Sequence, residues 1–268
     1  MTKTIMLVHG AWLTPACWDG FKTRYEAKGY TVHAPAWPFD DRPVPELRRA
    51  PHPELRKIGV KAIVDHYEQK IRALSEAPII MGHSFGGVIT QVLADRALGA
   101  ATVAIDPAPI AGVFVPPTTL ISALPVFLAP FGWARTLTMS RKAFGKRFAQ
   151  TLSEVEADEA YDRYVVPTPG RVYYDGLLGK GTKVRFDNPN RPPLLLIAGE
   201  KDLTAQPSMV KSNYEKQRLA PSATGFKMFP GRSHWLCVDR DWEEVADFAL
   251  DWAAANALKS NAMPLTAV

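Results

Sequence analysis

A six-residue run, Gly82-His83-Ser84-Phe85-Gly86-Gly87, constrains this chain more than any other part of its sequence. An apolar segment at 78–81 precedes the run and a helical pattern at 85–98 follows it, so the serine lies in a strand-to-helix turn. Glycine two residues before and two after the serine suits a turn too tight for side chains at those positions. Such a turn exposes a serine hydroxyl at a helix N-terminus, where backbone N–H groups favour negative charge. The run predicts Ser84 as a nucleophile, and the alternative is a simple glycine turn.

A nucleophilic serine needs a neighbouring base to take its proton, and histidine is the usual one. His234 fits best among the six histidines, because it follows the last predicted strand, 225–229, and precedes the last predicted helix. His9 ends the first predicted strand and His83 adjoins the nucleophile, so both are expected to be structural or to line a pocket. The other three lack a supporting motif: His33, His52 and His66.

A carboxylate is expected between the serine and the histidine in chain order, to fix the tautomer of the imidazole. Asp202 follows the predicted strand 194–198 and is the preferred acid. Two rivals remain open. Asp106 ends the predicted strand 101–105, and Glu200 lies two residues before Asp202.

Acyl transfer also needs two N–H donors for the developing oxyanion. The residue after the nucleophile supplies one in such turns, here Phe85, and the turn after the first strand supplies the other, here Ala11 in His9-Gly10-Ala11-Trp12.

Short apolar runs alternate with helical patterns over residues 1–106 and again over 192–268, which predicts an α/β core with a mostly parallel sheet. Six such runs are expected to be strands: 4–8, 30–34, 78–81, 101–105, 194–198 and 225–229. Helical segments broken by prolines fill 107–191, and we expect them to form an inserted helical cap. The irregular stretch 35–53 is a candidate rim of the site.

The composition, 47% hydrophobic and 22% charged, is that of an ordinary globular protein. The net charge of +5 comes with two loose basic groups that no aromatic residues interrupt, so we expect a solvated surface and no nucleic-acid partner. Cys17 and Cys237 are expected to be free thiols. With no signal-peptide pattern and no apolar run of about 18 residues, the sequence predicts no membrane span and a cytoplasmic location.

These motifs together resemble those of the α/β-hydrolase superfamily over nearly the whole chain. The opening His9-Gly10-Ala11, followed by Trp18, is similar to the branch with plant methyl esterases and hydroxynitrile lyases. The resemblance implies an eight-stranded sheet with a helical cap, no cofactor or metal, and activity on carboxylic esters. Hydroxynitrile lyases of that branch carry threonine where this chain has Gly10 and lysine where it has Trp235, which disfavours cyanohydrin cleavage.

The expected substrate is a small ester or lactone, cleaved through an acyl-enzyme by a monomer or homodimer. Trp12, His83 and Trp235 flank the predicted catalytic residues and are candidate substrate contacts. Phe127 and Trp133 of the cap either wall a pocket or pack the cap onto the core. Carbon–carbon, amide or peptide cleavage and metal-free perhydrolysis remain alternatives, as does a non-catalytic small-molecule receptor.

Overall fold

The computed structural model describes residues 2–261 and is built on one six-stranded parallel sheet. The strand order is β2-β1-β3-β4-β7-β8. The strands are β1 (Thr4–Val8), β2 (Thr31–His33), β3 (Ile79–His83), β4 (Ala101–Ile105), β7 (Leu194–Gly199) and β8 (Thr224–Phe229). This confirms the predicted α/β class with a mostly parallel sheet.

The number of strands in the sheet corrects one expectation. Eight strands were implied by the resemblance, whereas the described residues form six in this sheet. Each of the six coincides with one of the apolar runs that were expected to be strands. The antiparallel pair β5 (Thr136–Leu137) and β6 (Thr168–Pro169) forms a separate small sheet.

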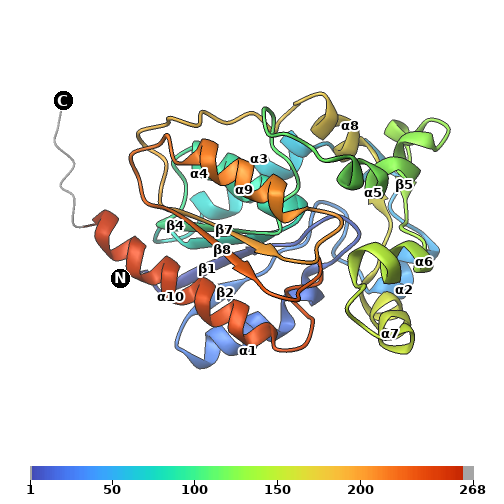
Figure 1. Cartoon of the computed structure of the whole chain (residues 1–268), viewed down its shortest axis with the longest axis horizontal. Helices are drawn as coiled ribbons and strands as arrows, with labels where there is room; N and C mark the ends of the chain where they lie inside the picture. Colours follow the sequence, from blue (N-terminus) through green and yellow to red (C-terminus); the bar gives the residue numbers. More distant parts are fainter. Residues whose placement is uncertain (1, 262–268) are drawn as a thin grey trace.

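Helices cover both faces of the six-stranded sheet (Figure 1). The helices α1 (Asp19–Ala27) and α10 (Trp242–Asn261) lie on one face. On the other lie α3 (Val60–Arg72), α4 (Phe85–Asp95) and α9 (Pro207–Gln217). Because both faces are covered, β3, β4 and β7 are buried along their whole length, which explains their uninterrupted apolar sequences.

The segment between β4 and β7 holds the helices of the predicted cap. They are α5 (Pro117–Leu128), α6 (Arg141–Ala143), α7 (Glu154–Tyr164) and α8 (Arg171–Leu177). This segment lies at the right-hand end of the molecule in Figure 1, beyond the sheet. Its status as a separate domain, 107–191, stays a prediction. The stretch 35–53, expected to be irregular, contains the short helix α2 (Val44–Arg49).

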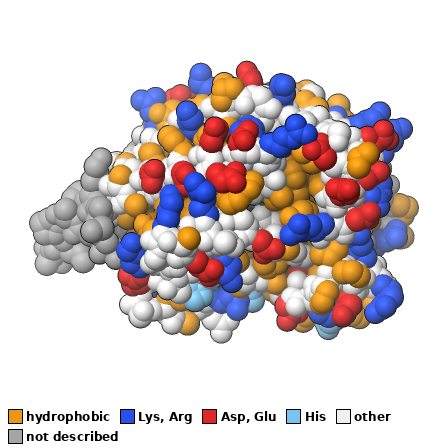
Figure 2. Space-filling model, turned by 90° about the horizontal axis from the view of Figure 1, so that it is seen from below, with side chains coloured by type: hydrophobic (Ala, Val, Ile, Leu, Met, Phe, Trp, Pro, Cys, Tyr) orange, Lys and Arg blue, Asp and Glu red, His pale blue; other side chains and the backbone are white. Residues whose placement is uncertain are grey.

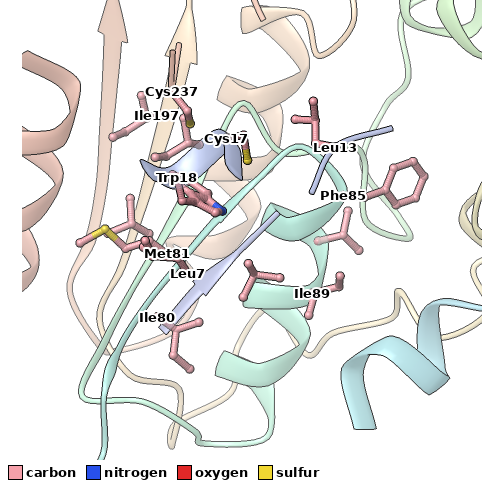
Figure 3. Packing of buried hydrophobic residues seen from close by; sticks show 14 of the residues in the cluster. Leu7, Leu13, Cys17, Trp18, Ile80, Met81, Phe85, Ile89, Ile197 and Cys237 are labelled. Carbon is pink, nitrogen blue, oxygen red and sulfur yellow. The ribbon is translucent and has the colours of Figure 1, made fainter. Parts of the chain in front are cut away.

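The buried core continues from the sheet to the start of α4 (Figure 3). Trp18 and Met81 pack among the strands, whereas the Phe85 ring points away from them at the margin of the cluster. Cys17 and Cys237 are buried free thiols, as predicted. No helix within residues 2–261 combines the length and the apolar character that crossing a bilayer requires.

Candidate active site

Ser84 lies in a strained turn between β3 and α4. Its backbone angles are φ 57° and ψ −119°, a conformation that a residue other than glycine rarely adopts. A Cβ atom at Gly82 would lie 2.1 Å from the Gly86 carbonyl oxygen, and one at Gly86 would lie 2.0 Å from the Val8 carbonyl oxygen. Only glycine fits at either position, which is the steric reason for the spacing in the sequence.

His234 and Asp202 form a fully buried pair at the carboxyl end of the sheet. His234 Nδ1 lies 2.6 Å from Asp202 Oδ2. The other carboxylate oxygen, Oδ1, accepts the N–H groups of Thr204 at 2.6 Å and Ala205 at 2.8 Å. Because Nδ1 donates its proton to a carboxylate, the neutral ring leaves Nε2 free to accept one.

The His234 ring packs against the residue that precedes the serine. The ring centroids of His83 and His234 are 4.7 Å apart, and Phe148 packs edge-on against His234 at 4.5 Å. Within residues 2–261, His234 Nε2 is buried and has no hydrogen-bond partner, so it makes no bond with the Ser84 hydroxyl. The pair therefore presents an unoccupied proton acceptor beside the strained turn.

Asp106, the rival acid, is buried next to the same pair but is bonded differently. Its Oδ1 accepts the Gly199 N–H at 2.7 Å, while Oδ2 is buried without a partner in the described part of the chain. Burial, and next the charge of Asp202, raise the pKa of Asp106 well above its usual value. The protonated form of Asp106 is thus favoured, and Asp202 is the carboxylate that contacts His234. Glu200, the second rival, accepts the Gly231 N–H at the surface.

Two further buried histidines, whose neutral form is favoured, lie near Ser84. His83 Nε2 donates to the His234 carbonyl oxygen at 2.8 Å, and burial lowers its pKa well below the usual value. His9 Nδ1 donates to the Gly10 carbonyl oxygen at 3.0 Å, while Nε2 accepts the Trp37 N–H at 3.1 Å. Burial lowers the pKa of His9 to about 4. Both rings therefore hold backbone segments of the site in place.

The turn after β1 lies directly against Ser84. A Cβ atom at Gly10 would be 2.9 Å from Ser84 Cβ, so the backbone at Gly10 and Ala11 adjoins the serine. No hydrogen bond from the Ala11 or Phe85 N–H is found within residues 2–261. Phe85 is also the first residue of α4, where N–H groups lack helical partners.

Aromatic rings wall the site on the side of the α5–α8 segment. Trp12 donates its indole N–H to the Leu137 carbonyl oxygen at 3.1 Å, and its ring packs on Tyr173 at 5.0 Å. Tyr173 in turn packs edge-on against Phe85 at 4.9 Å. Sequence reasoning missed both Tyr173 and Phe148, because each lies in a segment without a motif. Their only signal is that they are aromatic.

A cavity of about 370 Å³ begins at Phe85 and Tyr173 and runs between α5 and α8. Most of its lining is apolar, including Ile110, Val113, Leu120 and Phe127, with Lys183 as the charged member. Of the predicted substrate contacts, Phe127 lines this cavity. The three tryptophan candidates do not: Trp12 packs on Tyr173, Trp133 is exposed and packs on Tyr174, and Trp235 is buried among aromatic rings.

His83, Asp106 and His234 also offer a group of nitrogen and oxygen atoms within 4.8 Å of one another. A divalent cation needs deprotonated ligands, and the raised pKa of Asp106 opposes this. His83 already uses one ring nitrogen for the His234 backbone. The chemistry of these three side chains therefore disfavours a metal centre.

The parallel sheet, the strained serine turn and the buried Asp–His pair define an α/β protein of hydrolase type. The model of the alpha/beta hydrolase family matches residues 5–248, and the chain belongs to this family. A search of curated proteins finds no match.

Solved structures of similar fold cover nearly the whole chain. Tomato methylketone synthase I superposes with a TM-score of 0.72 at 16% identity, covering 96% of this chain and 99% of that one. The monoacylglycerol lipase of Paleococcus ferrophilus gives 0.66 at 18% identity, with 96% of each chain covered. A pyrethroid hydrolase from Sphingobium faniae gives 0.67 at 18% identity, covering 96% of this chain and all of that one. At these identities the likeness is one of fold.

Proposed function

We propose that this protein is a serine hydrolase that cleaves carboxylic esters through an acyl-enzyme, with Ser84 as nucleophile, His234 as base and Asp202 as the orienting acid. The observation that carries the proposal is the 2.6 Å contact between His234 Nδ1 and Asp202 Oδ2, next to the strained Ser84 turn. The carboxylate fixes the tautomer in which Nε2 carries no proton and can accept one.

In the proposed first step, His234 Nε2 takes the Ser84 hydroxyl proton as the oxygen attacks the ester carbonyl. The N–H groups of Ala11 and Phe85 donate hydrogen bonds to the oxyanion. This role is supported by their lack of hydrogen-bond partners in the described structure. The imidazolium then returns its proton to the departing alcohol. Water repeats the sequence on the acyl-enzyme and releases the acid, which regenerates Ser84.

The cavity supports an ester with an apolar part. Its walls carry one charged side chain, Lys183, and its inner end is formed by Phe85, the residue after the nucleophile. We place an alkyl or aryl group of the substrate there, with Phe127 as a contact. Esterase and lipase names among the fold relatives, such as the monoacylglycerol lipase, agree with this substrate class.

Activity-based labelling tests the mechanism. The protein should react with a fluorophosphonate and hydrolyse p-nitrophenyl esters, and Ser84→Ala should abolish labelling and lower kcat/KM by about 10⁴-fold or more. Ser208→Ala removes an exposed serine on α9 and serves as the matched control. Labelling that persists in Ser84→Ala, or turnover equal to wild type, would refute the assignment. Amide, lactone and diketone substrates in the same assay separate ester cleavage from the other reactions of similar folds.

A further inference from the structure

An unusual share of the exposed apolar side chains lies around the cavity. Thirteen large hydrophobic side chains are exposed in the described residues, and nine of these belong to α5, α8 or the segments beside them. We call these nine the apolar surface: Phe114, Leu120, Ile121, Leu124, Leu128, Phe131, Trp133, Leu177 and Leu178. The helix α5, α8 and the short 3-10 turn Gly132–Ala134 contact one another, so the nine lie on neighbouring elements. Monomeric proteins rarely expose extended apolar areas without a function.

The outer side of the helix α5 is apolar. Leu120, Ile121, Leu124 and Leu128 are all exposed, and at 3.6 residues per turn they fall within about 100° of arc. The buried residues of the helix are Thr119, Ser122 and Val126. An apolar stripe on a helix normally packs against another surface, whereas this one faces solvent in the described structure.

The apolar surface surrounds the mouth of the cavity. Leu120, Leu177 and Leu178 belong to the exposed set and also line the cavity. Phe85, the residue after Ser84, lines the same cavity. The cavity therefore connects exposed apolar side chains with a residue of the serine turn.

Basic side chains predominate around this surface. Residues 107–153 contain five basic and no acidic side chains, whereas the rest of the chain has 27 of each sign. Arg135, Lys180 and Lys183 are exposed just beyond Trp133 and Leu178, and none of the three forms an ion pair within residues 2–261. Figure 2 shows the underside of the molecule, on which acidic and basic side chains are interspersed.

The apolar surface and the basic side chains beside it together indicate the kind of partner. An apolar patch with a basic border matches the surface of an anionic lipid bilayer, into which apolar side chains insert while lysine and arginine contact the head groups. A second copy of the chain would bring the same basic border against itself. We propose that the apolar surface docks the protein on anionic lipid membranes, with the cavity mouth facing the lipid.

Vesicle sedimentation of the full chain tests the docking without any measurement of catalysis. The protein should sediment with vesicles of phosphatidylcholine and phosphatidylserine, more weakly with phosphatidylcholine alone, and less as salt rises. Leu128→Gln with Phe131→Asn should lower the affinity at least about tenfold, since each removes one inserted side chain. Asn suits position 131, where the backbone is left-handed with φ 55°.

The matched control removes two exposed apolar side chains elsewhere. Val155 and Leu219 are 68% and 67% exposed, compared with 73% and 68% for Leu128 and Phe131. Val155→Gln with Leu219→Gln should leave vesicle binding unchanged. Thermal unfolding shows that both double variants remain folded.

Two results would overturn the proposal. One is a failure of the folded wild-type protein to bind the anionic vesicles. The other is a dimer in sedimentation equilibrium that Leu128→Gln with Phe131→Asn dissociates, because the surface would then be an interface between two copies. Neither result bears on Ser84, so the proposed chemistry can stand or fall separately.

Discussion

The carboxyl edge of the sheet and the segment between β4 and β7 differ in how far their side chains are buried. At the sheet edge, Ser84, Asp202 and His234 are all buried, and backbone N–H groups and close-fitting glycines hold their positions. In the segment around α5, large apolar side chains face solvent and the charge is basic.

In the proposed function, the buried sheet edge carries out the chemistry and the exposed segment around α5 admits the substrate. A proton relay depends on distances of a few tenths of an ångström and needs a rigid, fully packed frame. A surface that admits substrate needs the right chemistry rather than a fixed geometry, so it can remain open on one side. Substitutions at the sheet edge should therefore have larger effects than comparable ones around α5.

The largest expected effect distinguishes the two carboxyls at the sheet edge. Asp202→Asn should lower kcat by about 10⁴-fold, because an amide no longer selects the tautomer with Nε2 free. Asp106→Asn should cost less than about tenfold, because the amide replaces a protonated carboxyl of similar shape. Steady-state kinetics of the two variants on one ester decide the assignment. The reverse order of effects would make Asp106 the orienting acid.

Alanine at a glycine of each region gives the next largest contrast. Gly86→Ala places a Cβ 2.0 Å from the Val8 carbonyl oxygen and should reduce the free energy of unfolding by about 3 kcal/mol or more. Gly145→Ala, between α6 and α7, places its Cβ 3.6 Å from Ala157 Cβ and should change stability by about 1 kcal/mol or less. Denaturant unfolding measures both. Equal losses would contradict the view that the sheet edge is the more tightly fitted region.

Acid sensitivity should also come from the sheet edge, since the predicted cap contains no histidine. Burial lowers the pKa of His9 from 6.5 to about 4, so the unfolded chain binds a proton in this range and the folded chain does not. The free energy of unfolding is therefore unaffected by His9 above pH 6.5. It falls by about 3 kcal/mol in total as the pH decreases from 6.5 to about 4. In His9→Gln the fall in unfolding free energy over this range should shrink by that amount.

Replacement of an exposed histidine controls for general effects. His52→Gln, in the loop before α3, should leave the pH dependence of unfolding as in wild type. An unchanged slope in His9→Gln would show that other groups cause the acid sensitivity.

The predicted strands and the serine turn agree with the structure because both follow from local patterns. An apolar run marks a buried parallel strand, and two glycines around a serine mark a turn that no larger residue fits. The sheet of six strands differs from the eight that family resemblance implied, since resemblance carries an average pattern whereas the runs belong to this chain. Tyr173 and Phe148 could not be found in this way, because a ring in a motif-free helix gives no sign of what it contacts.

The sequence by itself determined the class of the fold, the turn that holds Ser84 and the residue types of a proton relay, because each depends on short spacings along the chain. Only the tertiary structure shows which of Asp202 and Asp106 contacts His234. Both aspartates follow a strand at the same sheet edge, and the difference is which carboxylate reaches His234 and which is buried beside another charge. Pairing across 32 residues and the local electrostatic environment are properties of the folded chain, so no spacing in the sequence specifies them.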